Sequence, residues 1–381
     1  MSEPIWFNRP AVVGRELDYM RQAMEQGTIS GDGVFTKRCH KLLEQITGSR
    51  KALLTTSCTH ALEMAALLLD LRPGDEVVCP AFTFVSTINA FVLRGARPVF
   101  VDIRADTLNL DERALESAIT VRTKAIIVVH YAGVACDMDT IMAVASRHGL
   151  PVIEDNAHGL FGRYKGRPLG SFGAMSTLSF HETKNVTSGE GGALLINDER
   201  YIDRAEIIRE KGTNRTRFFR GEIDKYTWVD VGSSYLPSEL LAAYLLAQLE
   251  ARDEIQRRRH AIWSGYASAL TIGPARILRL PIVPAGCEHP AHLFYVLAPS
   301  LEARTALISA MRALQILIVF HYQPLHLSDM GRLLGGRSGQ CPVTEDVSDR
   351  LVRLPCYFQL RDDEQARVVD GLQEALAVLQ S

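Results

Sequence analysis

Short apolar runs alternate with longer segments of helical period between residues 76 and 155. The apolar runs predict strands at Glu76–Pro80, Pro98–Ile103, Lys124–His130 and Pro151–Asp155. Between them, segments such as Thr83–Arg94 and Asp137–His148 repeat apolar residues with the period of a helix. Strands that alternate with helices indicate β-α-β units, and therefore a mostly parallel sheet covered on both faces.

The flanking sequence predicts further elements of both kinds. Helices are expected over residues 14–27 and Val34–Thr47. The strands at Met175–Phe180 and Gly192–Asn197 follow one another with no helix between them, so the sheet should be mixed. Beyond them the pattern predicts helices over residues 237–267, 300–313 and 362–379, and strands at 277–283, 292–298 and 314–320.

The length of 381 residues suits two domains. We interpret residues 1–250 as a large α/β domain and residues 251–381 as a smaller C-terminal domain of α+β type. No low-complexity tract and no Pro/Ser-rich linker separates them, so the two parts should pack closely.

Composition excludes several classes of protein. Forty-seven per cent of the residues are apolar and 23% are charged, as in ordinary globular proteins. The net charge of −2, with no basic stripe, argues against a dedicated nucleic-acid binder. No apolar run approaches the roughly 18 residues of a membrane span. The seven cysteines include no C-x-x-C pair, and the N-terminus lacks a signal-peptide pattern, so we expect a cytoplasmic protein without a zinc site or disulfide framework.

Candidate chemistry lies where the predicted strands end, because open α/β sheets bind ligands at the carboxyl ends of their strands. One strand delivers Asp155 and then His158, and another delivers Lys184 ahead of a glycine-rich turn. The hydroxyl-rich run Thr55–Thr59 opens a predicted helix, where backbone N–H groups can hold an anion. Phe84 follows the strand that ends at Pro80.

Each of these features also has an ordinary interpretation. A single lysine is usually solvated, and an aspartate at a strand end is more often a cap or an ion-pair partner. The Thr55–Thr59 run is then a capping segment, Gly189–Gly192 a tight turn and Phe84 a core residue. His181-Glu182 begins the zinc motif H-E-x-x-H, but Asn185 stands where its second histidine belongs, so no metal site is expected.

The features together fit one cofactor, pyridoxal phosphate. Its enzymes need a lysine for the Schiff base and an acid that keeps the pyridine nitrogen protonated. Lys184 and Asp155 supply these two groups, and the Thr55–Thr59 helix start suits a phosphate.

Several motifs carry a resemblance to a known family. Ser179–Asn185 with Gly189–Gly192 resembles the lysine motif of the DegT/DnrJ/StrS family of sugar-nucleotide aminotransferases. Further motifs match in the same order, at Pro80–Phe84, Val99–Asp102, Glu154–His158 and His321–His326. Within the family, Thr55–Ala66 and Val231–Leu240 are most similar to the dTDP-4-amino-4,6-dideoxygalactose transaminases. The resemblance covers nearly the whole chain and implies a homodimeric pyridoxal-phosphate enzyme of fold type I.

The resemblance also implies roles for individual residues. Lys184 matches the Schiff-base lysine, which also shuttles the proton, and Asp155 matches the partner of the pyridine nitrogen. Phe84 matches the aromatic residue that stacks on the ring. The remaining matched cofactor contacts are Cys58, Thr59, His158 and Ser179. The residues expected to contact the sugar nucleotide are Arg215, His321 and Tyr322.

One motif departs from the family pattern. The family often has G-x-N-x-R where this chain has Gly232-Ser-Ser234-Tyr-Leu236. The asparagine position implies a contact with the cofactor phosphate of the partner subunit, so Ser234 is expected to make it with a shorter side chain or through a water. Leu236 stands where the pattern has an arginine, so the contact of that arginine is not expected here.

The resemblance therefore predicts transfer of an amino group from L-glutamate to C4 of dTDP-4-keto-6-deoxy-D-glucose, giving dTDP-4-amino-4,6-dideoxy-D-galactose. The alternatives are an aminotransferase for another keto-sugar nucleotide, a non-enzymatic regulator on the same fold, and a scaffold that binds no cofactor. Dehydratase relatives carry histidine at the lysine position, so Lys184 argues against that branch. A regulator would need a DNA-binding module, which the sequence does not show.

Overall fold

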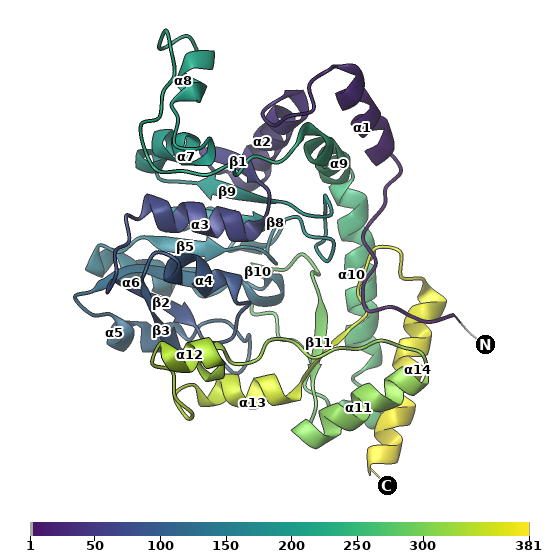
Figure 1. Ribbon diagram of the computed structural model, residues 1–381. Coiled ribbons are helices and arrows are strands. Elements are labelled where there is room, and N and C mark those ends of the chain that lie inside the picture. The colour runs from purple at the N-terminus through teal and green to yellow at the C-terminus, as the bar shows by residue number, and fades with distance from the viewer. Residues whose placement is uncertain (1–2, 381) are drawn as a thin grey trace.

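The computed structural model describes residues 3–380 and is built on a seven-stranded mixed sheet (Figure 1). From one edge to the other its strands are β1 (Lys51–Thr55), β9 (Gly192–Ile196), β8 (Met175–Ser179), β5 (Val152–Asp155), β4 (Thr123–Val129), β2 (Glu76–Pro80) and β3 (Arg97–Val101). Among these described strands, β9 runs in the direction opposite to the other six. The predicted α/β class and the mixed sheet are both confirmed.

Both faces of the sheet are buried, because each strand alternates its apolar side chains between two helical layers. Val77 belongs to the core under one face, and its neighbour Val78 belongs to the core under the other. The first face packs against α3 (Cys58–Leu68), α4 (Ser86–Val92) and α7 (Ile202–Arg209). The second packs against α5 (Leu115–Ala118) and α6 (Met138–His148), and nearer β1 against α1 (Glu16–Glu25), α2 (Val34–Thr47) and α9 (Glu239–Glu250).

The C-terminal part has a core of its own. It comprises α10 (Arg252–Ala269), β11 (Phe294–Leu297), α11 (Leu301–Ala313), β12 (Leu351–Leu354) and α14 (Asp362–Gln380). Ile5, from the start of the chain, is completely buried in this core and bridges to Ile316. The short helices α12 (Asp329–Leu333) and α13 (Pro342–Arg350) return to the seven-stranded sheet, where the Val343 amide donates to Asp102. The domain division at residue 250 stays a prediction.

Two predicted strands are wrong. Residues 314–320 are extended but pair only through isolated bridges, at Ile316 and Val319, and residues 277–283 make one bridge, at Arg279. Leu278, Ile316 and Ile318 are buried in the C-terminal core, which explains the apolar pattern, but neither segment has a strand paired continuously along it. The predicted helix over 237–267 is two helices that meet at Ala251.

Several short elements escaped the sequence pattern. The edge strand β1 is only five residues long and begins with a lysine. A small sheet joins β10 (Cys287–Glu288), β6 (Arg163–Tyr164) and β7 (Arg167–Pro168). Single 3-10 turns lie at η1 (Glu112–Ala114), η2 (Tyr131–Gly133), η3 (Glu199–Tyr201), η4 (Gly273–Ile277) and η5 (Leu325–Leu327).

An arm formed by residues 213–231 extends from the body of the molecule and contains the short helix α8 (Arg215–Phe219) (Figure 1). The arm exposes large apolar side chains, namely Phe219, Tyr226, Trp228, Val229 and Val231. Among residues 3–380, no helix combines the length and the apolar character that a bilayer crossing requires.

Candidate active site

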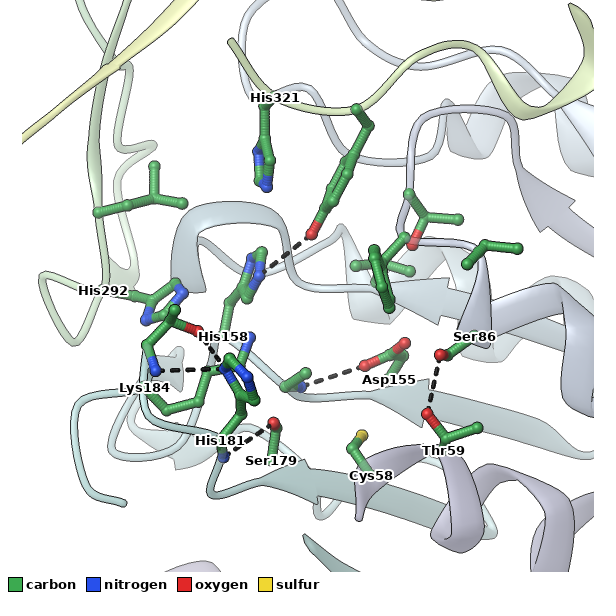
Figure 2. Close-up of a pocket in the computed structure, with 18 of the residues that line it drawn as sticks. Cys58, Thr59, Ser86, Asp155, His158, Ser179, His181, Lys184, His292 and His321 are labelled. Carbon is green, nitrogen blue, oxygen red and sulfur yellow. Dashed lines mark hydrogen bonds between the residues drawn. The ribbon is translucent and has the colours of Figure 1, made fainter. Parts of the chain in front are cut away.

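A cavity of about 1130 Å³ opens at the carboxyl edge of the seven-stranded sheet. Its walls come from the ends of β5 and β8, the starts of α3 and α4, and C-terminal segments around residues 292 and 320. It brings together nine of the residues predicted from the sequence, and Figure 2 shows seven of them labelled. These nine are Cys58, Thr59, Phe84, Asp155, His158, Ser179, Lys184, His321 and Tyr322.

Lys184 lies in a tight turn just beyond β8, where its amide donates to the carbonyl of His181 at 2.9 Å. The turn directs the side chain into the cavity (Figure 2). Burial lowers the pKa of Lys184 to about 8, although the nearby Cys58 and Asp155 oppose this shift. A substantial fraction of the amine is therefore in its neutral, nucleophilic form near physiological pH, far more than for an ordinary lysine.

Asp155 is the last residue of β5 and is 5% exposed. Its Oδ2 accepts a 2.7 Å hydrogen bond from the Thr87 hydroxyl, and its Oδ1 accepts one from the Ala157 amide. Burial raises the pKa of the Asp155 carboxyl, while these hydrogen bonds and the charge of Lys184 lower it. The site thus holds a carboxylate in a fixed orientation close to a lysine.

The start of α3 forms a cradle of hydroxyl and amide groups. Ser57 is the N-cap and accepts from the amide of His60, so the amides of Cys58 and Thr59 are left without an acceptor among the described residues. The Thr59 hydroxyl donates to Ser86 at 2.8 Å. These groups lie at the positive end of the helix dipole and form an anion-binding position.

Gly192 allows strand β9 to approach this helix start. A Cβ atom at residue 192 would lie 2.3 Å from the carbonyl carbon of Ser57 and 2.4 Å from the amide nitrogen of Cys58. A Cβ atom this close would clash with the backbone of Ser57 and Cys58, so only glycine fits here without moving the start of α3. This contact gives a physical reason for the last glycine of the Gly189–Gly192 motif.

Three histidines and a tyrosine line the opposite wall. The ring of His158 stacks on His292, with centroids 4.3 Å apart, and its Nε2 lies 3.3 Å from the Tyr322 hydroxyl (Figure 2). The ring of His321 stacks on Tyr322 with centroids 3.6 Å apart. Burial lowers the pKa of His158, His292 and His321 well below the ordinary value, so all three rings are neutral.

Phe84 follows β2 and is 56% exposed within the cavity, not buried in the core. Its ring centroid lies 6.3 Å from that of Tyr322. An exposed aromatic ring above a polar site is available for stacking on a flat ligand.

Two predicted residues lie outside the cavity that this chain forms. Ser234 is exposed and pairs with Glu210 through an isolated bridge. Arg215 lies at the base of the arm, where its Nη1 is 3.3 Å from the Glu210 carboxylate. A single chain therefore does not bring either side chain to Lys184.

Four further residues of the site were not predicted from the sequence. Thr87 and Ser86 resemble ordinary helix-start residues in the sequence. His292 accompanies Pro290 in a loop with no recognisable motif, and its Nδ1 lies 2.9 Å from Oδ1 of Asn185. Arg353 offered one signal, because it interrupts the apolar strand Leu351–Leu354 with a charge.

Known proteins resemble this chain along most of its length. The model of the DegT/DnrJ/EryC1/StrS aminotransferase family matches residues 10–373. The spore coat polysaccharide biosynthesis protein SpsC of Bacillus subtilis is 33% identical over 376 residues, covering 97% of this chain and 96% of the relative.

Solved structures agree with the family match. The putative sugar aminotransferase Spr1654 from Streptococcus pneumoniae, in its PMP form, superposes with a TM-score of 0.92 at 27% identity, covering 98% of this chain and 100% of that one. Its PLP form superposes equally well. The aminotransferase TlmJ from Streptoalloteichus hindustanus gives a TM-score of 0.91 at 28% identity, covering 99% of this chain and 100% of that one.

Proposed function

This chain belongs to the DegT/DnrJ/EryC1/StrS aminotransferase family and is a sugar aminotransferase, and from that premise we propose its reaction. L-Glutamate donates its amino group to C4 of dTDP-4-keto-6-deoxy-D-glucose, and the product is dTDP-4-amino-4,6-dideoxy-D-galactose. The observation that carries the proposal is the meeting of Lys184, Asp155 and the α3 cradle in one cavity. The choice of sugar rests on the similarity of Thr55–Ala66 and Val231–Leu240 to that group of transaminases.

We propose pyridoxal 5′-phosphate as the cofactor, and the donor set of the cavity fits it. The unpaired amides of Cys58 and Thr59 suit its phosphate, with Ser179 at the same wall. Asp155 suits its pyridine nitrogen, and the exposed face of Phe84 suits its ring. When bound, the cofactor supplies a conjugated ring that withdraws electrons from the carbon bearing the amino group. PLP and PMP forms of Spr1654 support this choice.

The side chains of the cavity have separate roles in the proposed reaction. Lys184, with a pKa of about 8, attaches the cofactor and then accepts and returns a proton at its Nζ. Asp155 is held by Thr87 and keeps a negative charge beside the ring nitrogen. His158, which corresponds to the family position near the cofactor, packs against the same site from the other wall. The buried histidines and tyrosines exclude water from Lys184.

The sugar nucleotide is proposed to occupy the outer part of the cavity. A volume of about 1130 Å³ exceeds what the cofactor alone needs. His321 and Tyr322 lie on the wall that the sugar would contact, and Arg215 would reach it only from a second chain.

We propose a homodimer with shared active sites. The arm exposes aromatic and apolar side chains on a segment that packs little against its own chain, which is typical of an interface. Ser234 follows the arm and is exposed, so it is free to contact the cofactor phosphate of the partner subunit. The proposed compartment is the cytoplasm, in keeping with seven cysteines that are all unpaired.

A coupled assay with a panel of keto-sugar nucleotides tests the proposed substrate. The purified holoenzyme is given L-glutamate with dTDP-4-keto-6-deoxyglucose, a 3-keto isomer, or a uridine diphosphate 4-keto sugar. We expect the highest kcat/KM for the first substrate, and a small H3–H4 coupling in the proton NMR spectrum of the product. A preference for another panel member, or a large coupling, contradicts the proposed sugar or stereochemistry.

A further inference from the structure

Arg353 is the second of two cationic side chains that line the cavity. Among the lining residues within the described part of the chain, only Lys184 and Arg353 are lysine or arginine. Three of the four histidines that line the cavity, His158, His292 and His321, are neutral because burial lowers the pKa of each, and the fourth, His181, lies 3.7 Å from the Glu190 carboxylate. When Lys184 carries the cofactor it no longer offers a free ammonium group. Arg353 is then the permanent positive charge that this chain supplies.

The guanidinium of Arg353 is held rigidly but is not neutralised. Its Nε and Nη2 donate to the carbonyl of Phe320 at 3.3 and 3.1 Å, and its Cζ lies 4.7 Å from the centre of the Phe7 ring. The backbone is fixed by a bridge between Val319 and Arg353. Within residues 3–380 no carboxylate forms an ion pair with it, and its Nη1 has no hydrogen-bond partner.

This arrangement is costly without a ligand. Burial lowers the pKa of Arg353, which means that the surroundings disfavour its charge. Its charge in turn contributes to lowering the pKa of Lys184 and of His321. Arg353 is partly buried, and a partly desolvated guanidinium with a free donor and no ion-pair partner is stabilised when an anion binds it.

A neutral donor lies next to the guanidinium. The buried Tyr131 hydroxyl lies 2.7 Å from Nδ1 of His321, and we assign the hydroxyl as the donor because it has no other acceptor among the described residues. The ring proton of neutral His321 is therefore on Nε2. Phe320, whose carbonyl holds Arg353, directly precedes His321, so the two donors belong to one stretch of wall.

We propose that Arg353 binds a carboxylate of the amino donor, an α-amino dicarboxylate, with His321 as a second donor. This proposal rests on the proposed function for the existence of an amino donor. The guanidinium fork matches a carboxylate with two parallel hydrogen bonds. The donor must bring its α-carbon to Lys184, so its α-carboxylate is one bond from the reacting atom, whereas the diphosphate of a sugar nucleotide is separated from it by the sugar ring. Arg353 and Lys184 line one cavity, which favours the group nearer to the reacting carbon.

The test separates the two half-reactions in Arg353→Gln. Single-turnover absorbance follows cofactor conversion by L-glutamate, and a second experiment follows the return reaction with the keto-sugar nucleotide. We expect kcat/KM for glutamate to fall about 100-fold, as for loss of two charge-assisted hydrogen bonds. The keto-sugar half-reaction should change less than about threefold. The reverse pattern would assign Arg353 to the diphosphate and overturn the proposal.

Donor analogues identify the carboxylate and exclude a merely structural role. 4-Aminobutyrate lacks the α-carboxylate of glutamate, and L-2-aminobutyrate lacks the γ-carboxylate. The effect of Arg353→Gln should disappear for the analogue that lacks the carboxylate bound by Arg353 and persist for the other. Equal losses with glutamate and both analogues would overturn the proposal.

Matched variants control for folding and charge. Arg312→Gln removes an exposed arginine from α11, away from the cavity, and should leave both half-reactions unchanged. Arg353→Lys keeps the charge but not the fork, so it should lose about tenfold with glutamate. It also replaces Arg353→Gln if that variant fails to fold.

Calorimetric titration of the holoenzyme with glutarate adds a readout that does not depend on turnover. We expect glutarate to bind the wild type and to lose most of its affinity in Arg353→Gln. If the wild type aminates a different sugar, the proposed substrate fails while this result stands. If wild type and variant bind glutarate equally, the inference fails whatever the sugar.

Discussion

The hydroxyl of Thr87 donates a 2.7 Å hydrogen bond to Oδ2 of Asp155, the buried carboxylate at the end of β5. Thr87 belongs to α4, so two separate elements fix the orientation of this carboxylate. The Thr83 hydroxyl lies 2.8 Å from that of Thr87 and extends the chain of hydroxyls. Since the Ala157 amide occupies the other oxygen, the carboxylate cannot rotate without breaking two hydrogen bonds.

Thr87→Val should lower kcat about tenfold, because it removes one hydrogen bond to a charged group, of about 1.5 kcal/mol, while keeping the side-chain shape. Asp155→Asn should lower kcat far more, because the charge itself is lost. Steady-state kinetics with thermal unfolding as a folding control measure both. Near wild-type rates in Asp155→Asn would show that this residue is structural.

Lys184→Ala should abolish turnover, because the group that attaches the cofactor and the group that moves the proton are lost together. Borohydride treatment followed by mass spectrometry should detect a covalent cofactor adduct in the wild type and none in the variant. Lys165→Ala, which removes an exposed lysine, serves as the control. Retained activity in Lys184→Ala would refute the assignment.

Attachment of the cofactor should speed up as pH rises through about 8. Only the neutral amine of Lys184 attacks the cofactor aldehyde, and its pKa is lowered from 10.5 to about 8. At pH 7.5 roughly a quarter of this lysine is neutral, against about 0.1% for an ordinary lysine. Stopped-flow absorbance of apoenzyme mixed with pyridoxal phosphate between pH 6.5 and 9.5 should show the midpoint. A rate still rising steeply at pH 9.5 would argue against it.

Gly192→Ala should weaken cofactor binding and lower the free energy of unfolding by about 2 kcal/mol or more. The new Cβ meets backbone atoms of Ser57 and Cys58 at 2.3–2.4 Å and must displace the α3 cradle. Cofactor titration and urea unfolding measure the two effects. Gly371→Ala is the control, since its nearest neighbours are side-chain atoms at 3.1–3.4 Å. Equal behaviour of the two variants would show that the close approach is relieved elsewhere.

Mixing two inactive variants tests the shared active site. Ser234→Trp should block the site of the partner subunit, and Lys184→Ala inactivates its own. A mixed dimer then keeps one intact site, so random exchange should restore about a quarter of wild-type activity. Sedimentation should report at least a dimer. An active monomer, or no recovery after verified exchange, would contradict the shared site.

The sequence predicted the half of the site that follows strand ends. Asp155 ends a buried apolar strand and Lys184 lies in the turn beyond another, and parallel strands bring such positions to one edge of a sheet. Arg353 could not be placed, because β12 reaches the cavity through pairing with β11 and Val319, which no local pattern encodes. Ser234 and Arg215 are a different case, because their predicted positions depend on a second chain.

The contrast between local sequence pattern and contacts of distant segments also explains which helices and strands were predicted correctly. Strand β2 and helix α2 have the bounds predicted from the sequence. In each, the spacing of the apolar residues matches the side chains that are buried in the structure. Residues 314–320 have the composition of a strand, but a strand also needs a neighbour of matching length, and only single bridges form there. Composition reports burial, whereas pairing depends on distant segments.

The bridge between Ile5 and Ile316 has a consequence for the order in which the chain assembles during synthesis. The seven-stranded sheet has all its strands once residue 196 has emerged from the ribosome, so the segments holding Lys184 and Asp155 can dock early. Residues 5–7 can make their native contacts only after more than 300 further residues have been synthesised. This holds for the bridge from Ile5 to Ile316 and for the packing of the Phe7 ring against Arg353. We therefore expect nascent chains to acquire the cofactor side of the cavity first and the opposite wall only near the end of translation.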